Sequence, residues 1–192
     1  MTEDMDRIAI DVGEVLQRTV TSLYSYLVTR PTGRAVRMAI ETQLQDAGRR
    51  SLSLIDLSEV VILDFSCADE VVARLLEHSS ESLSHEAFFV FRGVHEPHRD
   101  QIQTVLERRG LAAVAETQAD FFELLGDRTP AEERAWAVVE ERGLVAAEEV
   151  ADVLRAESDR AGLDRLIERR LAFRSPNTGR IHALSQLARH LL

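Results

Sequence analysis

A chain of 192 residues, 45% of them hydrophobic, is long enough to bury the core of one large or two small domains. All 23 basic residues are arginine and the formal net charge is −10, so a P-loop lysine, a Schiff-base lysine and a Ser-Lys dyad are excluded. The single cysteine excludes a disulfide framework and a multi-cysteine zinc site.

Strands and helices alternate along the first two thirds of the chain. Residues 8–16 mix apolar and acidic side chains and suit either a strand or the start of a helix. Helical spacing of apolar residues predicts helices over 34–47, 69–78 and 99–109. Short β-branched or aromatic runs predict buried strands at 52–57, 60–63, 87–91 and 111–115. A short helix is predicted after the last strand, through Phe121, Phe122 and Leu125, so the alternation indicates an α/β fold with a parallel or mixed sheet.

A polar stretch at residues 126–130 divides the chain near residue 128. Thr129 reads as a helix N-cap, Pro130 takes the tolerated first position, and Glu132 completes a capping box. Charge divides there too, because residues 1–128 hold 22 acids and 13 arginines (net −9), whereas 129–192 hold 11 and 10 (net −1). We therefore expect one domain over 1–128 and a second over 129–192.

Residues 129–192 read as three helices followed by a hairpin. The helices are predicted at 130–142, at 147–154 and at 159–171, the last one capped by Ser158. Short strands at 172–174 and 180–184 flank a Pro-Asn-Gly turn at 175–179. A short amphipathic helix over 185–192 would close the domain or pair with a second copy in a homodimer.

Two motifs in the first domain point to a family. A predicted strand ends in Asp56-Leu57-Ser58-Glu59-Val60, and Asp64-Phe65-Ser66-Cys67-Ala68-Asp69-Glu70 then opens a predicted helix. These motifs resemble the STAS domain of anti-sigma-factor antagonists, and the second is closer still to a STAS-like family of unknown function found near histidine-kinase-type ATPase domains. The resemblance covers residues 30–126 and implies a protein-binding signalling module, not an enzyme.

The family's phosphorylated serine has no exact counterpart in this chain. In the family, a partner kinase phosphorylates a serine after the aspartate and so switches partner binding. Aligning Asp64 with that aspartate puts Phe65 at the phosphoserine position, Ser66 next to it, and Cys67 in place of a glycine. The partner-binding and phosphosite candidates are accordingly Asp64, Phe65, Ser66 and Asp69.

The same residues have simpler structural roles. Ser66 has the spacing of an N-cap whose hydroxyl would bond the Asp69 amide, and we favour this reading over a phosphosite. Asp64 is either an ordinary loop acid or part of a partner-contact rim. Cys67 reads as a small buried filler more readily than as a reactive thiol.

The order helix-helix-helix-hairpin, with Leu166 to Arg174 and then Gly179-Arg180-Ile181-His182, resembles the winged helix-turn-helix of bacterial transcription regulators. The resemblance implies that the third helix enters the major groove and that the hairpin contacts the backbone or minor groove. Residues 155–192 hold 8 arginines against 4 acids, which favours this role locally. The alternative is a winged helix that docks protein, because Asp159, Asp164 and Glu168 weaken the basic face. The DNA-binding candidates are Arg160, Arg165, Arg169, Arg174, Asn177, Thr178 and Arg180.

Other clusters carry weaker signals. His95 and His98 have a spacing that zinc could use, but a solvated loop is the favoured reading. An aromatic-arginine cluster could hold an anion or form a domain-packing seam, and we favour the seam; its members are Tyr24, Tyr26, Arg30, Gly33, Arg34 and Arg37. No motif brings Ser, His and Asp together for hydrolysis, so no catalytic residue, metal or cofactor is assigned.

The sequence therefore predicts a bacterial regulator with an α/β STAS-like domain and a C-terminal α+β winged helix-turn-helix domain. Its expected partners are DNA and a protein such as an anti-sigma factor or an ATPase-type kinase. The alternative is a signalling module that does not bind DNA. No apolar run reaches the ~20 residues of a membrane span and residues 1–7 carry no signal-peptide pattern, so we expect a cytoplasmic location without membrane contact.

Overall fold

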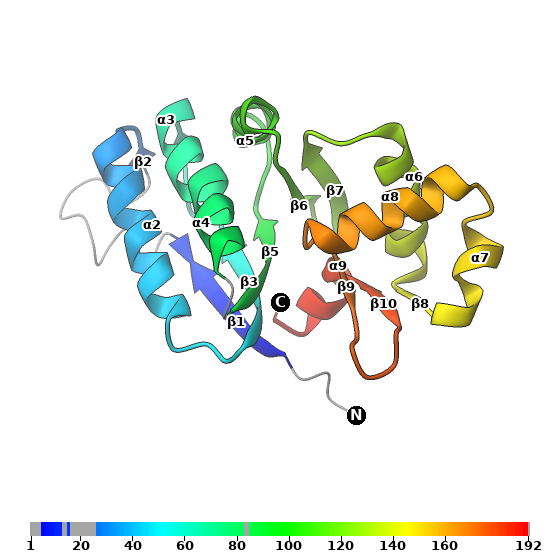
Figure 1. Cartoon of the computed structure of the whole chain (residues 1–192). Helices are drawn as coiled ribbons and strands as arrows, with labels where there is room; N and C mark the ends of the chain where they lie inside the picture. Colours follow the sequence, from blue (N-terminus) through cyan, green and yellow to red (C-terminus); the bar gives the residue numbers. More distant parts are fainter. Residues whose placement is uncertain (1–4, 13–14, 16–25, 83–84, 192) are drawn as a thin grey trace.

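A five-stranded sheet forms the centre of the computed structural model, which describes residues 5–12, 15, 26–82 and 85–191 (Figure 1). The strands lie in the order β1-β3-β5-β6-β7. Their bounds are β1 Asp6–Asp11, β3 Arg50–Asp56, β5 Glu86–Arg92, β6 Ala112–Gln118 and β7 Phe121–Gly126. The first four run parallel and β7 pairs antiparallel with β6, so the protein has a mixed α/β fold with a parallel-rich sheet.

Three helical segments cover one face of this sheet. The first is α2 (Arg30–Leu44). The second is one continuous helix, which consists of α3 (Phe65–Ala68), the π-helical turn η1 (Asp69–Arg74) and α4 (Leu75–Glu81). The third is α5 (His98–Arg109). A short parallel pair, β2 (Tyr26–Leu27) with β4 (Ile62–Leu63), lies before α2 and α3 in the chain. Buried side chains from the helices and from this face of the sheet form one hydrophobic cluster, which includes Ile55, Phe91 and Val105.

The C-terminal part combines short helices with a three-stranded antiparallel sheet of order β8-β10-β9. Its helices are α6 (Pro130–Arg142), η2 (Ala147–Glu149), α7 (Val150–Val153), α8 (Glu157–Glu168), α9 (Leu184–Ala188) and η3 (Arg189–Leu191). Its strands are β8 (Leu144–Val145), β9 (Ala172–Arg174) and β10 (Ile181–Ala183).

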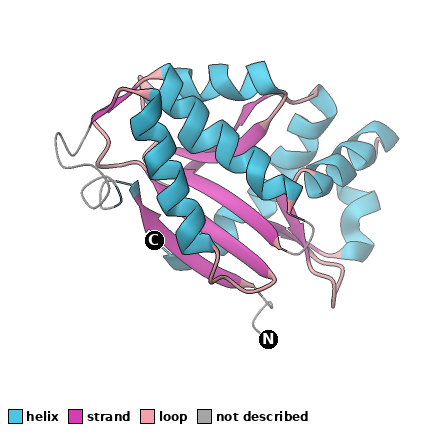
Figure 2. Ribbon diagram, turned by 60° about the vertical axis from the view of Figure 1, so that its left-hand side comes forward, coloured by secondary structure: helices cyan, strands magenta, loops and turns pink. Residues whose placement is uncertain are grey.

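The C-terminal part covers the second face of the large sheet, so helices lie on both sides of it (Figure 2). A second hydrophobic cluster joins Phe88 and Val90 of β5 to Trp136, Phe173 and Leu184 of the C-terminal part. The rings of Phe88 and Phe173 meet edge to face with their centroids 5.5 Å apart. Because both faces are covered, β5 is a continuous apolar run from Ala87 to Phe91. Strand β3 is likewise buried from Ser51 to Ile55, although serine alternates with leucine along it.

The antiparallel strand β7 corrects one prediction. Residues 121–125 were expected to form a short helix, but they extend and pair with β6 after a turn at Asp120, whose φ is 59°. Phe122 and Leu124 lie in the cluster shared with the C-terminal part, and Leu125 lies in the other cluster. From sequence alone a short apolar run suits either a helix or a strand, and here the pairing with β6 makes it a strand.

Three helix starts also differ from the predictions. Helix α2 begins at Arg30, capped by the Thr29 hydroxyl, which accepts from the amide of Thr32 at 3.4 Å. The next helix begins at Phe65 instead of Asp69, and α8 begins at Glu157 after Ala156, so Ser158 lies inside the helix and does not cap it.

Several predicted boundaries are confirmed. The capping box of α6 is present in both directions, with the Thr129 amide donating to Glu132 at 2.7 Å and the Glu132 amide donating to Thr129 at 3.2 Å. Gly110 ends α5 in the left-handed region, at φ 64°. Of the segment over 8–16, which suited strand or helix, residues 8–11 belong to strand β1 (Asp6–Asp11), and residues 13, 14 and 16 lie outside the described residues. Within the described part of the chain, no helix is long and apolar enough to cross a membrane.

Candidate functional site

The helix that begins at Phe65 is capped by Asp64, not by Ser66. The Asp64 carboxylate accepts from the backbone N–H of Cys67 at 2.8 Å and from the Ser66 hydroxyl at 2.9 Å. Asp64 has extended backbone (φ −81°, ψ 166°), as an N-cap residue requires, whereas Ser66 already lies inside the helix. The prediction that the Ser66 hydroxyl caps this helix is therefore wrong.

Two neighbours of Ser66 are held by packing. The guanidinium of Arg108 lies over the half-buried Phe65 ring, 4.7 Å from its centroid. Cys67 is buried, its thiol contacts the Thr29 carbonyl at 2.9 Å, and burial together with the Asp64 carboxylate raises the pKa of Cys67 to about 12. Cys67 thus stays protonated and serves as the buried filler that the sequence predicted.

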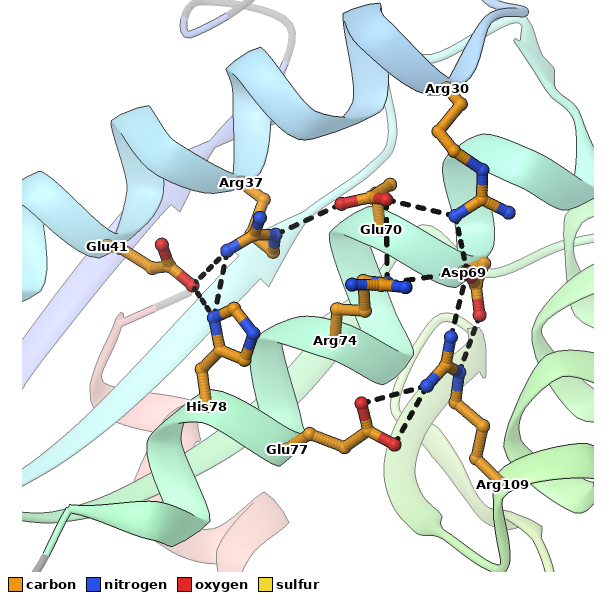
Figure 3. A network of polar contacts seen from close by, with 9 residues as sticks. All are labelled: Arg30, Arg37, Glu41, Asp69, Glu70, Arg74, Glu77, His78 and Arg109. Carbon is orange, nitrogen blue, oxygen red and sulfur yellow. Dashed lines mark hydrogen bonds and ion pairs between the residues drawn. The ribbon is translucent and has the colours of Figure 1, made fainter.

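A network of charged side chains, which we call the interhelix network, lies between α2, the helix 65–81 and α5 (Figure 3). Its members are Arg30, Arg37, Glu41, Asp69, Glu70, Arg74, Glu77, His78 and Arg109. Glu70 is fully buried and accepts from Arg30 Nη1 at 2.9 Å and from Arg37 Nε at 3.2 Å, while Arg74 Nε lies 3.5 Å away. Such a carboxylate is stable only because arginines surround it.

Asp69 connects the outer two helices through the middle one. It accepts from Arg30 of α2 at 2.7 Å and from Arg109 of α5 at 2.6 and 3.0 Å. Burial by itself would raise the pKa of Asp69, but the hydrogen bonds from Arg109 and Arg30 hold that pKa below its ordinary value. Arg109 also bonds both oxygens of Glu77 at 2.9 Å.

The far end of the interhelix network contains a histidine. Arg37 donates to Glu41 at 2.7 Å, and the Nδ1 atom of His78 lies 2.9 Å from Arg37 and 3.0 Å from Glu41. The network pairs Arg30, Arg37, Arg74 and Arg109 with an equal number of carboxylates. The two predicted cluster members Arg30 and Arg37 thus bind carboxylates between helices of the first part of the chain, not in the domain-packing seam that was favoured. Tyr24 lies outside the described residues.

The predicted DNA-binding residues fall into two groups. Arg160 and Arg169 do not point outward: Arg160 donates to the carbonyls of Leu154 and Arg155 at 2.9 and 2.8 Å, and Arg169 faces the first part of the chain. Backbone carbonyls hold both guanidinium groups: those of Leu154 and Arg155 after α7 bind Arg160, and that of Asp127 after β7 binds Arg169. The exposed group consists of Arg165, Arg174, Asn177, Thr178 and Arg180.

Acidic side chains lie beside two of the exposed arginines, Arg165 and Arg174. Arg174 Nη2 lies 3.0 Å from Asp164 of α8, and both side chains are largely exposed. The exposed charged side chains of α8 are Glu157, Asp164, Arg165 and Glu168. This helix face therefore carries three acids and one arginine.

Arg169 and Arg170, at the end of α8, join the C-terminal part to the first part of the chain. Arg169 donates to Glu132 Oε1 at 2.8 Å and to the Asp127 carbonyl at 2.8 Å. Arg170 has a positive φ of 59° and donates to the Ser79 carbonyl, just past the middle of α4, at 2.9 Å. These two arginines, which we call the joint arginines, fix the end of α8 against α4 and the residues after β7.

His95 and His98 are the two histidines whose spacing zinc could use. His98 is buried, its Nε2 lies 3.3 Å from the Val61 carbonyl, and its ring lies 5.4 Å from that of His95. Burial lowers the pKa of His98, and the neighbouring His95 lowers it further. Among the described residues, no group of three or more His, Cys, Asp or Glu side chains could hold a metal ion.

Sequence reasoning did not single out Glu70, Arg109 or the joint arginines as linked groups. One signal was available for Glu70, because two adjacent acids within an apolar helix pattern need basic partners. Comparison of the chain with protein-family models, with curated proteins and with solved structures found no match.

Proposed function

We propose that this chain is a non-enzymatic signalling protein, in which a STAS-like α/β unit meets a protein partner and a winged helix-turn-helix unit docks protein. The C-terminal order of three helices and a β8-β10-β9 sheet supports the winged-helix assignment. The sequence motifs at residues 56–60 and 64–70 support the STAS-like assignment, as does the packing of the first part's own helices, α2, α3–α4 and α5, on one face of the sheet.

The charge on α8 is the observation that carries the choice of protein over DNA. In a winged helix the third helix faces the major groove, where arginine and lysine neutralise phosphates. Helix α8 instead exposes Glu157, Asp164 and Glu168 beside Arg165, and the nearby Arg174 is paired with Asp164. This face would repel a DNA backbone but suits a protein surface of mixed charge.

Site-specific photo-cross-linking in the native cells tests this function. A photoreactive phenylalanine analogue replaces Phe65 beside the helix cap, Ala161 on the exposed side of α8, or Met38 on the exposed side of α2 as the control. We expect protein adducts from positions 65 and 161 and none from position 38. The captured protein should then bind the purified wild-type chain and fail to bind the Phe65→Arg variant; equal labelling at all three positions would refute the proposal.

The exposed wing supports DNA binding as a second candidate function. Arg174, Asn177, Thr178 and Arg180 all lie in or beside the β9–β10 hairpin, where a wing contacts backbone phosphates. If the chain acts this way, Arg165→Ala and Arg180→Ala should each weaken duplex binding and reduce the slope of log affinity against log salt by about 1. Fluorescence anisotropy titrations at several salt concentrations measure that slope.

A further inference from the structure

A cavity of about 340 Å³ lies where the two parts of the chain meet. Its walls come from α4, from the first residues of β5 and β6, and from the end of α8. The joint arginines flank it, with Arg170 reaching Ser79 on one side and Arg169 reaching Asp127 on the other. Any molecule inside it would touch both parts of the chain at once.

Both apolar and polar side chains line this cavity. Leu76, Phe89 and Leu171 line it together with small alanine side chains, and Ser79, Glu168 and Arg170 add polar groups to the lining. Small-molecule sites share this composition and lie preferentially between structural units. The volume is near the lower end of the ~300–1,000 Å³ typical of such sites, which suits a single small ring system.

Arg170 indicates the charge of a ligand that would fit this cavity. Within the described part of the chain its guanidinium forms no ion pair, and its hydrogen bond goes to the neutral Ser79 carbonyl. A guanidinium has five N–H donors and prefers a carboxylate or phosphate oxygen. The carboxylate of Glu168 opposes an anion here, but it is exposed to water, so its repulsion is screened.

We propose that this cavity binds a small apolar carboxylate, with its ring or branched chain against Phe89 and Leu76 and its carboxylate on Arg170. Such a ligand would hold α4 to the end of α8 and thereby stabilise the joint between the two parts. The site requires neither the protein-docking role nor the DNA-binding role of the C-terminal part. A test that refutes either role would therefore leave this proposal unaffected.

Calorimetric titration with 1-naphthoate, and with the uncharged 1-naphthylmethanol, tests the site. The wild-type chain should bind the acid more tightly than the alcohol. Arg170→Asn should weaken binding of the acid about tenfold and leave that of the alcohol unchanged, because it removes a charge-assisted hydrogen bond to the carboxylate. Asparagine tolerates the positive φ at this position. Glu168→Gln should strengthen the acid by up to about fivefold, since it removes an exposed like charge.

Two further variants keep the test independent of any one substitution. Ala87→Leu fills the cavity from β5, and Ser79→Phe fills it from the half-exposed side of α4, so each should abolish binding of both probes. Arg165→Asn removes an exposed arginine elsewhere on α8 and is the matched control, which should change neither affinity. Circular dichroism melting checks that each variant is folded.

Three results would overturn the proposal. The first is a wild-type chain that binds neither probe at millimolar concentration. The second is binding that survives both Ala87→Leu and Ser79→Phe in their folded forms. The third is an acid affinity that Arg170→Asn and Arg165→Asn reduce equally, because general surface charge would then explain it.

Discussion

Glu70 is the residue on which the interhelix network depends most. Its carboxylate is fully buried, accepts hydrogen bonds from Arg30 and Arg37 of α2, and lies 3.5 Å from Arg74 of its own helix. Glu70→Gln should lower the free energy of unfolding by about 1.5–3 kcal/mol, because Arg37 keeps Glu41 but loses its fully buried carboxylate partner. Urea denaturation measures this loss, and Glu81→Gln, an exposed change at the end of the same helix, should stay within about 0.5 kcal/mol of the wild type.

His98 should make stability depend on pH near neutrality. Burial lowers the pKa of His98 in the folded chain below the ~6.5 of an unfolded histidine, so the unfolded state binds the proton more readily. Stability from this residue is present above about pH 6.5 and is lost as the pH falls from there through the folded pKa. Urea midpoints measured between pH 7.5 and 5 should fall for the wild type.

The His98→Gln variant tests whether His98 causes the slope of the urea midpoint against pH. Glutamine cannot take up a proton in this range, so the midpoint should change less between pH 7.5 and 5 than in the wild type. His95→Gln should keep most of the slope, because the His95 ring is exposed. An unchanged slope in His98→Gln would assign the pH dependence to other groups.

At the scale of single elements, the helix starting at Phe65 offers a direct comparison of two caps. Asp64→Ala removes the acceptor for the Cys67 amide and should cost about 1 kcal/mol, whereas Ser66→Ala removes only a hydroxyl that points back to Asp64. Ser66→Asp should destabilise the helix start more than Ser66→Ala, because it puts a second carboxylate beside Asp64. Thermal unfolding of the three variants ranks them; a larger loss from Ser66→Ala than from Asp64→Ala would restore Ser66 as the cap.

Close packing between α2 and this helix gives a second element-scale prediction. A Cβ atom on Gly33 would lie 2.9 Å from the Cys67 Cα atom and 3.2 Å from the Glu70 Cβ atom. Gly33→Ala should therefore push the helices apart and destabilise the chain, although alanine is normally the better helix former. Gly33→Ala with the same stability as the wild type in urea would show that the helices separate without cost.

The sequence predicted elements well where local signals were strong, and failed where distant contacts decided. The α6 capping box, the Gly110 helix end and strands 87–91 and 172–174 follow from local patterns and lie where expected. Residues 121–125 gave an ambiguous apolar run, and only pairing with β6 made them a strand. The Asp64 cap was missed because Ser66 also had an acceptable spacing, and the choice depends on backbone angles.

The candidate site was harder to predict than the fold for a related reason. Asp64, Phe65, Ser66 and Asp69 do cluster at one helix start, since they are neighbours in sequence. Arg169 looked exposed from helical spacing, but the carbonyl groups that bind it belong to Asp127 and Gly110, far away in the chain. Pairings over such separations leave no periodic signal in one sequence.

For the whole molecule, the hydrophobic cluster that joins Phe88 to Trp136 and Phe173 indicates that both parts unfold together. The chain carries its own reporters, because its single tryptophan, Trp136, lies in the C-terminal part and its single cysteine, Cys67, lies in the first part. Tryptophan fluorescence and pulsed alkylation of the thiol should give the same urea midpoint. A fluorescence transition at lower urea than the thiol transition would show that the C-terminal part detaches first.

The joint arginines should influence both reporters equally. Arg169→Ala removes the ion pair to the buried Glu132 and the bond to the Asp127 carbonyl. We expect a loss of about 2–3 kcal/mol that shifts the Trp136 and Cys67 midpoints together. Arg155→Ala, an exposed change in the same part of the chain, is the control and should shift neither. A shift confined to Trp136 would mean that this joint does not couple the two parts.

We propose that the C-terminal part meets protein through α8 instead of reading DNA. Selection from a pool of random-sequence duplexes, followed by anisotropy titration of the recovered sequences at about 50 and about 200 mM salt, tests this most directly, because binding through phosphate contacts weakens steeply between these concentrations. We expect no enriched sequence and no saturable binding at micromolar protein, because α8 would turn Glu157, Asp164 and Glu168 toward the DNA. An enriched sequence bound at micromolar concentration or below, weakened by salt and lost in Arg165→Ala and Arg174→Ala, would contradict it.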